Sequence, residues 1–520
     1  MRREEVVDGV LAAALVPLAL AVALPFRSEA ITRTPVSSLG WDAALHATEG
    51  LDLFDDLRLF RPLDALDLLL SRHWWGPAWA LVSAPFQAAF GPSLSTASLP
   101  SLVAFVLAPA AAFLLARRLV PGGLLAQAAI LLLVAALFLR SPMLLETSAW
   151  PMLESLSGFV ALLAWLFFAR RPARRTQRAA FLAGAALFLL KYHFGFFVLG
   201  TFLAVVLVEE TSDARRRLGA AARTLLLHGA GAGILVLATA LAALRVFLEA
   251  RWGDALASHA PSVPNTAWGA LVLFIFLGAA RRRTLSEAWI GASATFRDFV
   301  VFALLPAAAW CLDPANVRGW YRQIFQPTDV PARNPLAKLA EFGSFLRDDW
   351  TRGAGPAALV LAGLFLALVL PRGRTRRAFA IFALWPVVLM SLNAYPVEAR
   401  FLACLVPALL AAAVSGLAAL AATLPERARG PALAAAAVLL LFTLDTGRGR
   451  AERDARAPYR YAYGPVEIAA VNAAVAAAPP SGPVHLRLPA EPPVWPTVRL
   501  ALRLSRRDLA PADVDVSQAP

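Results

Sequence analysis

Long apolar stretches recur along most of this chain and are separated by short polar segments. A helix that crosses a bilayer needs about 20 mainly apolar residues. Thirteen stretches come near or exceed that length, at 6–24, 97–116, 122–140, 154–169, 179–193, 194–208, 222–247, 267–280, 298–312, 354–371, 378–392, 401–424 and 431–445. The pattern predicts an all-α polytopic membrane protein with about 13 transmembrane helices.

The first apolar stretch follows two arginines, as in a secretory signal peptide. Ala21-Val22-Ala23 would then supply the small-residue cleavage site. We interpret the stretch instead as an uncleaved first helix, because many further spans follow it.

The arginines between the stretches predict how the helices are oriented. Short cytoplasmic loops of membrane proteins collect Lys and Arg. The basic clusters are Arg2 and Arg3; Arg117 and Arg118; Arg170, Arg171, Arg174, Arg175 and Arg178; Arg215, Arg216, Arg217 and Arg223; Arg281 to Arg283; Arg372, Arg374, Arg376 and Arg377; and Arg427 and Arg429. All of them fall on one side only if 76–91, which Pro77 and Pro85 interrupt, does not cross. We therefore expect 76–91 to be a re-entrant or surface-lying helix on the outer face.

Composition narrows the class further. Hydrophobic residues make up 59% of the 520 residues and charged residues 16%, against about 25% charged in soluble domains. A single soluble domain, a disordered chain and a fibrous repeat are excluded. The net charge of +14 does not indicate a nucleic-acid partner, because the arginines are divided among short inner loops. Two cysteines, Cys311 and Cys404, allow no disulfide framework and no Cys-rich zinc site.

The chain divides into a transmembrane region, 1–446, and a small extracytoplasmic tail, 447–520. The tail reads as a helix at 465–478, a strand at 484–488 and a helix at 494–505, which predicts a small α/β cap. It carries no nucleotide-binding or zinc-protease signature, and the six histidines of the chain show no metal-ligand spacing.

The first outer loop, 27–96, concentrates acid and imidazole groups. Asp42 is predicted to be the N-cap of a helix. At about 100° per residue, Asp42, His46, Glu49 and Asp56 fall within a wedge of about 80°. This face could carry chemistry near the membrane. The alternative is that Asp42 only caps the helix and the others form a solvated face.

Aromatic and arginine side chains mark two further outer segments. Trp74 and Trp75 follow an arginine and would suit sugar or lipid head groups, although Trp also gathers at membrane interfaces without other function. Tyr321 and Arg322 lie in a long Pro-rich loop, 313–353, of the length typical of a lid or binding loop. Arg400 precedes a span and would place its guanidinium near head-group depth, where it could bind phosphate or merely anchor the helix.

Acidic and basic residues also stand at the ends of the spans. Glu146 and Glu154 lie at the mouth of one span, where Glu154 would favour a helix start. Lys191, Tyr192 and His193 lie between two apolar stretches. A charge at membrane depth is a functional candidate by default, and snorkelling to the outer surface is the alternative.

This ordered set resembles the GT-C superfamily of integral membrane glycosyltransferases over residues 1–425. The resemblance rests on Trp41-Asp42-Ala-Ala-Leu-His46, Phe90-Gly-Pro-Ser93, the acids Glu146 and Glu154, the segment 184–192 ending Lys191-Tyr192, and Arg400-Phe-Leu-Ala-Cys-Leu-Val-Pro407. It implies a GT-C-like bundle and inverting transfer of a sugar from a polyprenyl-phosphate donor to a hydroxyl of a lipid, glycan or protein.

The resemblance also implies roles for individual residues. Asp42 matches the family's general base, with Glu49 as a rival, and Arg400 and Lys191 match groups that hold the donor phosphate. The remaining candidates would line the substrate site, namely His46, Trp74, Trp75, Glu146, Glu154, Tyr192, His193, Tyr321 and Arg322. No metal or other cofactor is expected, because Ala43 and Ala44 follow Asp42 where many relatives carry a second acid. Divalent metal stays open through the second-loop acids, which bind metal in oligosaccharyltransferases only.

Taken together, the sequence predicts a multi-pass protein of the cytoplasmic membrane whose active site and tail face the extracytoplasmic side. Two other classes stay open. A transporter or lipid flippase would show charges inside spans and internal repeats, and a scaffold would act through its tail without catalysis.

Overall fold

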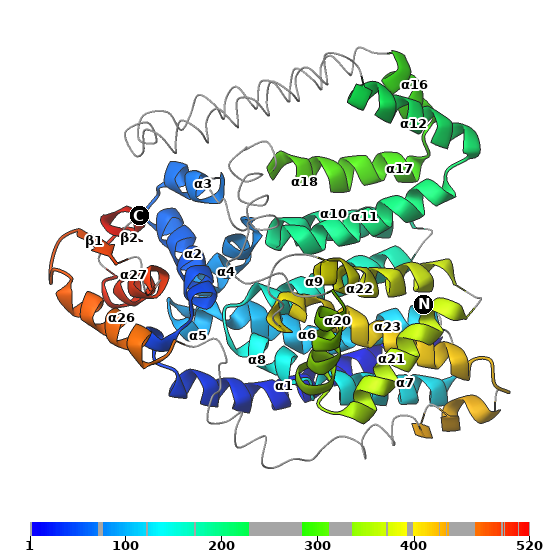
Figure 1. Cartoon of the computed structure of the whole chain (residues 1–520), viewed down its shortest axis with the longest axis horizontal. Helices are drawn as coiled ribbons and strands as arrows, with labels where there is room; N and C mark the ends of the chain where they lie inside the picture. The colour runs from blue at the N-terminus through cyan, green and yellow to red at the C-terminus, as the bar shows by residue number, and fades with distance from the viewer. Residues whose placement is uncertain are drawn as a thin grey trace.

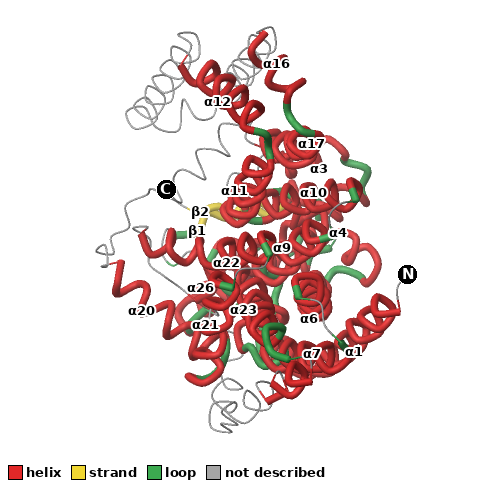
Figure 2. The backbone as a smooth tube through the Cα atoms, turned by 90° about the vertical axis from the view of Figure 1, so that its right-hand side faces the viewer, coloured by secondary structure: helices red, strands yellow, loops and turns green. Residues whose placement is uncertain are grey.

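The computed structural model describes residues 3–70, 76–120, 123–170, 173–227, 283–310, 335–370, 373–392, 399–425, 427–432, 434–435, 463–489, 492, 494–507 and 509–518. Within these ranges the chain is almost entirely helical, and the two strands of the C-terminal cap stand out in Figure 2. The all-α polytopic class predicted from the apolar stretches is therefore confirmed.

The N-terminal half supplies the helices from α2 to α5 near the cap and the first helices of the bundle. Its elements are α1 (Arg3–Arg33), η1 (Val36–Ser38), α2 (Trp41–Arg58), α3 (Pro62–Leu70), α4 (Ala78–Phe90), α5 (Leu94–Ala97), α6 (Leu99–Leu119), α7 (Leu124–Phe138), α8 (Pro142–Ala149), α9 (Leu153–Ala169), α10 (Arg174–Leu190), α11 (Tyr192–Glu209) and α12 (Ser212–Leu227).

The second half adds further bundle helices and the cap. Its elements are α16 (Arg283–Gly291), α17 (Ala294–Phe299), η2 (Val300–Leu304), α18 (Leu305–Trp310), α20 (Pro335–Phe345), η3 (Leu346–Trp350), α21 (Ala354–Val369), α22 (Arg374–Leu392), η4 (Ala399–Leu405), α23 (Val406–Ala421), α26 (Pro465–Ala477), β1 (Val484–Leu488), α27 (Trp495–Ser505), η5 (Pro511–Asp513) and β2 (Val514–Gln518). Figure 1 shows α6, α9 and α23 inside the bundle, with α2 and the cap gathered at one end.

Helix α23 is the centre of the bundle. All its residues except Leu420 are buried, and a helix that is apolar on every side can be stable only when it is enclosed. Small residues bring α21 very close to it. A Cβ on Gly416 would lie 1.8 Å from the carbonyl oxygen of Gly363, and one on Gly363 would lie 2.4 Å from that of Ala413. The two helices therefore pack backbone to backbone, as small residues allow in membranes.

The lengths of the described helices can be compared with the number of predicted membrane spans. Among the described residues, four helices are long and apolar enough to cross a membrane, Glu4–Arg33, Leu94–Leu119, Tyr192–Glu209 and Leu402–Ala421, or up to six if each of two bent pairs forms one span. The predicted stretches 222–247, 267–280 and 431–445 lie largely or wholly outside the described residues. The number thirteen therefore stays a prediction.

Helix α4 is the interrupted segment that was expected not to cross. Its 13 residues rise about 20 Å, which is less than the roughly 30 Å of a bilayer core. It packs against α2, and its place at the outer surface stays a prediction.

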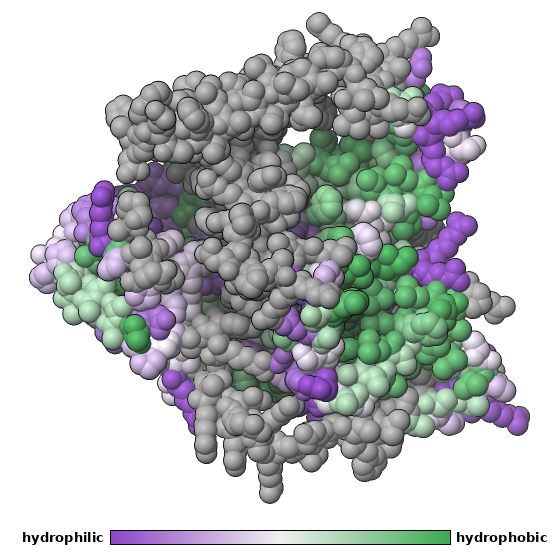
Figure 3. Space-filling model, in the orientation of Figure 1, coloured by the Kyte–Doolittle hydropathy of each residue, from purple (hydrophilic) through white to green (hydrophobic). Residues whose placement is uncertain are grey.

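Two ion pairs place the first basic clusters at the same end of the bundle. Arg117 at the end of α6 pairs with Asp8 at 2.8 Å, and Arg118 pairs with Glu5 at 3.3 Å, both near the start of α1. On the face shown in Figure 3, a broad apolar area lies beside a hydrophilic rim at the edge away from the cap, and the described surface of the cap is more mixed. This banding is typical of a protein surrounded by lipid.

The C-terminal cap has its own small core. Strands β1 and β2 pair in parallel with Val484 opposite Val514, and α27 forms the connection between them. The two valines pack with Val471 of α26 and Val498 of α27. The helix–strand–helix order predicted for the tail is present, whereas β2 was not expected. The proposed domain boundary at 446/447 lies outside the described residues.

Candidate functional site

The cap docks on the segment that leads into α2. Tyr463 donates its backbone N–H to the Ser38 carbonyl at 2.8 Å. The Thr497 hydroxyl donates to the Leu39 carbonyl at 2.9 Å, and Trp495 meets Trp41 edge to face with 6.2 Å between the ring centroids. The start of α2 is therefore fixed by a segment more than 400 residues away in the sequence.

Asp42 is not the N-cap of α2, contrary to our expectation. The cap is Gly40, whose backbone is extended with φ −65° and ψ 162°, and the helix begins at Trp41. Asp42 is therefore in the first turn, where the N-terminal end of the helix dipole stabilises its negative charge. Because capping is done by another residue, this simple structural explanation for Asp42 no longer holds.

A buried ion pair lies within electrostatic range of Asp42. Lys191, the residue between α10 and α11, donates from Nζ to Oε1 of Glu154 at 2.7 Å. Lys191 is 3% exposed and Glu154 6%. Asp42 and Cys404 both interact electrostatically with Lys191. Residues from α2, α9, the α10–α11 junction and η4 therefore converge at one end of the bundle.

Tyr463 brings the cap to the same place. Burial raises the pKa of its phenol, a hydrogen bond with Thr497 opposes that change, and the charges of Glu467 and Asp42 add to it. Its electrostatic interaction with Asp42 places the cap near the predicted general base. The sequence did not indicate that the cap would lie there.

His46 and Glu49 follow Asp42 along α2, and both are buried. His46 Nδ1 lies 3.4 Å from Oε2 of Glu49. Trp79 of α4 donates its indole N–H to the His46 carbonyl at 2.9 Å, and the two rings are 5.8 Å apart. The helical spacing therefore does place the imidazole and this second acid together.

The other predicted site residues fall into four groups. Tyr192 is buried and stacks on Trp310 at 5.9 Å, while His193 lies 5.2 Å from the Tyr192 ring. Glu146 is buried in α8. Arg400 lies in η4, about one turn before Cys404, and nothing is described of its side chain. Trp74, Trp75, Tyr321 and Arg322 lie outside the described residues.

An acidic cavity lies beside these groups, between α2, α3, the start of α27 and η5. Its volume is about 530 Å³, which is within the size range of small-molecule sites. Its lining is formed by Leu45, Thr48, Glu49, Asp52, Asp56, Asp64, Leu68, Trp495, Pro496, Arg499, Pro511 and Ala512. Of these, only Glu49 and Asp56 belonged to the predicted acidic face.

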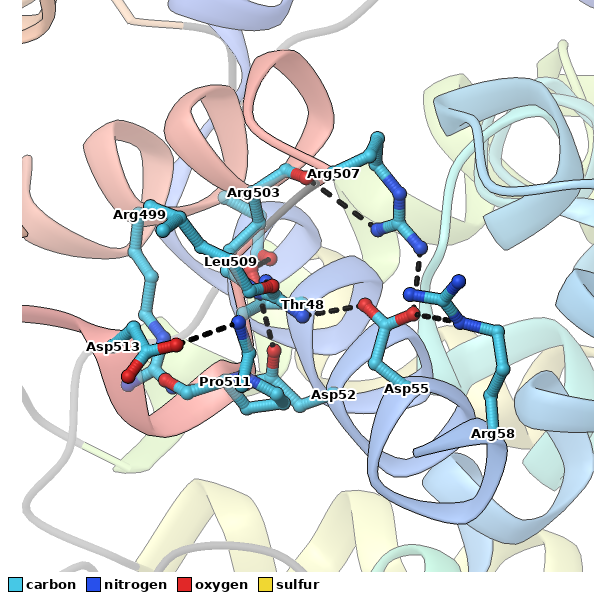
Figure 4. Close-up of polar contacts among 12 residues, drawn as sticks. Thr48, Asp52, Asp55, Arg58, Arg499, Arg503, Arg507, Leu509, Pro511 and Asp513 are labelled. Carbon is cyan, nitrogen blue, oxygen red and sulfur yellow. Dashed lines mark hydrogen bonds and ion pairs between the residues drawn. The ribbon is translucent and has the colours of Figure 1, made fainter. Parts of the chain in front are cut away.

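Two arginines of α27, Arg499 and Arg503, and Arg507 just after its end hold the cap to α2 (Figure 4). Arg499 and Arg503 each reach Asp52 at 3.0 Å. Arg503, which is 0% exposed, also pairs with Asp55, and Arg507 pairs with Asp55 at 2.6 Å. Arg499 and Arg503 are four residues apart and so share one face of α27, and the same spacing continues to Arg507 beyond the helix end. That spacing was the available sequence signal, and their acidic partners could not be identified from it.

Metal binding is not indicated by the described part of the chain, which contains no group of three or more His, Cys, Asp or Glu side chains placed to hold an ion. The expectation that no cofactor is needed stays a prediction.

Comparison with known proteins identifies the fold. No family model matches the sequence, and no curated protein does. The structure is similar to ArnT from Cupriavidus metallidurans bound to undecaprenyl phosphate, with a TM-score of 0.51, 14% identity, and coverage of 97% of this chain and 89% of that one. It is also similar to the Archaeoglobus fulgidus oligosaccharyltransferase in complex with Zn and sulfate, with a TM-score of 0.50, 13% identity, and coverage of 98% of this chain and 62% of that one. At such identities the likeness shows the fold, which is the one that the GT-C resemblance implied.

Proposed function

We propose that this protein is a membrane glycosyltransferase that moves a sugar from a polyprenyl-phosphate carrier to a hydroxyl of a lipid, glycan or protein. The observation that carries the proposal is the convergence of Asp42 with the buried Lys191–Glu154 pair at the cap end of an ArnT-like bundle. The solved ArnT holds undecaprenyl phosphate, which supports a carrier of that class here.

Asp42 is the proposed general base. Its carboxylate takes the proton of the acceptor hydroxyl while that oxygen bonds to the anomeric carbon. The bond from the anomeric carbon to the phosphate oxygen breaks, and the polyprenyl phosphate leaves with the electron pair. One displacement of this kind inverts the anomeric configuration. Glu49 is the second candidate base, but it lies seven residues further along α2, about 10 Å by helical rise, and is already in contact with His46.

Positive charge at the site would stabilise the leaving phosphate. Lys191 is held by Glu154, so its contribution is a fixed charge close to Asp42. Arg400 lies about one turn before Cys404 in η4, and we propose that its guanidinium binds the phosphate directly. The other predicted substrate contacts, among them Glu146, Tyr192 and His193, stay proposals on the same grounds.

We further propose that the site and the cap face the extracytoplasmic side of the cytoplasmic membrane. The ion pairs of Arg117 and Arg118 with Asp8 and Glu5 of α1 place that basic cluster at the end away from the cap. Under the charge rule for membrane proteins that end is cytoplasmic.

The test compares glycolipids, envelope glycans and membrane proteins from cells with and without the gene by mass spectrometry. The proposal expects at least one species to lose the mass of a sugar residue when the gene is deleted, and to regain it on complementation. A flippase would change the leaflet distribution of a lipid and leave its own covalent structure intact. Unchanged sugar content in all three fractions would refute the proposal.

A further inference from the structure

Asp56 is the residue that distinguishes the acidic cavity from an ordinary polar surface. It is 3% exposed and lines the cavity. Its carboxylate makes no hydrogen bond or ion pair with any residue in the described part of the chain. A buried carboxylate without a partner is costly, because the protein does not replace the water that it loses.

The other acids in the lining already have partners. Asp52 is bound by Arg499 and Arg503. Glu49 contacts His46 at 3.4 Å, and Asp64, at the more exposed edge, lies 4.0 Å from Arg61. Among the acids of the lining, Asp56 is therefore the one whose carboxylate has no described partner.

The surroundings of Asp56 favour a positively charged occupant. The pKa of Asp56 is raised to about 6, mainly by burial and then by the negative charges of Asp52 and Asp64, against the smaller opposing effects of Arg503 and Arg61. At neutral pH the group is mostly ionised and lacks a counter-ion. The same lining contains Trp495, and aromatic faces attract cations.

We propose that this cavity binds a small organic ammonium ion, with Asp56 as its counter-ion and Trp495 as its aromatic contact. An organic ion is favoured over a metal ion because the described residues offer no set of three metal-ligating side chains. The apolar part of the lining, Leu45, Leu68, Pro496 and Pro511, suits the carbon skeleton of such a ligand.

Asp56 is distant from Asp42, the proposed base of the transfer site, although Glu49, the second candidate base, also lines the cavity. Asp56 lies fourteen residues after Asp42 on α2, about 21 Å by helical rise. Ammonium binding can therefore be measured without a transfer assay, and the failure of either proposal leaves the other standing.

The ammonium group could come from a soluble amine or from the head group of a membrane lipid. The test uses the full-length protein in phosphatidylglycerol nanodiscs, whose lipid contains no amine. Isothermal titration with ethanolamine is compared with titration with ethylene glycol, which keeps the hydroxyl chemistry and lacks the charge. The proposal expects saturable binding of ethanolamine and much weaker binding of ethylene glycol.

Two variants sharpen this test. Asp56→Asn should bind ethanolamine at least about tenfold more weakly, because it loses a charge-assisted hydrogen bond. The matched control Asp515→Asn removes an exposed acid of β2 and should bind as the wild type does. Equal binding of ethylene glycol and ethanolamine, or unchanged ethanolamine binding in Asp56→Asn, would overturn the proposal. The first comparison needs no variant, so it holds even if Asp56→Asn fails to fold.

The source of the ammonium group follows from a second set of nanodiscs that contain phosphatidylethanolamine. If a lipid head group fills the cavity, ethanolamine will no longer titrate into these discs and Asp56→Asn will release the lipid. If ethanolamine titrates as before, the natural ligand is a soluble amine. Both results agree with an ammonium site and separate its two sources.

Discussion

Lys191 and Glu154 form an ion pair of 2.7 Å that is enclosed by the helix bundle. Removing one partner of a buried pair leaves the other charge without compensation, at a cost of about 3–5 kcal/mol. Glu154→Gln should therefore lower the free energy of unfolding in detergent by about that amount.

The same pair offers a way to separate structure from function. The double variant Lys191→Met with Glu154→Gln contains no buried charge at this place and should be more stable than Glu154→Gln alone. If Lys191 stabilises the leaving phosphate, the double variant will recover its melting temperature and not its transfer activity. Recovery of both would reduce Lys191 to a structural role.

The contact between Arg503 and the two acids of α2 predicts how firmly the cap is held. Arg503 is completely buried and bonds both Asp52 and Asp55. Arg503→Met should release the cap and make residues of α27 susceptible to limited proteolysis in folded membranes. Arg507→Met is the matched control, because Arg507 is 29% exposed and exposed ion pairs contribute about 1 kcal/mol or less. Equal resistance of the two variants to proteolysis within α27 would contradict this role for Arg503.

The pKa of Asp56 predicts a stability that depends on pH. The folded-state pKa of about 6 is above the unfolded value near 3.8, so its contribution is complete below about pH 4 and is lost as the pH rises through 6. Relative to Asp56→Asn, the wild type should therefore lose up to about 3 kcal/mol of stability between these limits. Paired melting curves from pH 4 to 7.5 measure the difference, and a difference independent of pH would show that Asp56 is not perturbed.

The close crossing of α21 and α23 predicts that position 416 tolerates no side chain larger than that of glycine. Gly416→Ala would place a Cβ 1.8 Å from the Gly363 carbonyl oxygen, so the helices must separate and the protein should be destabilised by several kcal/mol. Gly200→Ala is the control, since its Cβ would meet no atom within 4 Å. Fluorescence-detected gel filtration after heating compares them, and similar melting of both variants would contradict the described packing.

Much of the helical framework could be predicted, because apolar length is a local property. The stretch 154–169 became α9, Leu153–Ala169, and the tail strand at 484–488 became β1, Val484–Leu488. The strand β2 was missed although Val514-Asp-Val-Ser517 alternates apolar and polar residues, because so short a segment is a weak signal until its parallel partner is known.

The candidate site was only partly predictable, for the same reason. Helical spacing was enough to bring His46 to Glu49, which are three residues apart. It could not show that Asp52 would bind Arg503, whose position is 451 residues away, or that Lys191 would bind Glu154. The N-cap of α2 was misplaced because the extended backbone at Gly40 depends on contacts with the cap.

The central claim is that Asp42 removes the proton of the acceptor, and one variant tests it most directly. Asp42→Asn keeps the size of the side chain and removes the base, so transfer of sugar by the purified protein should fall by about a hundredfold or more. Its melting temperature and membrane insertion should match those of Asp515→Asn, the exposed control on the cap. Full transfer activity in Asp42→Asn would contradict the proposed mechanism.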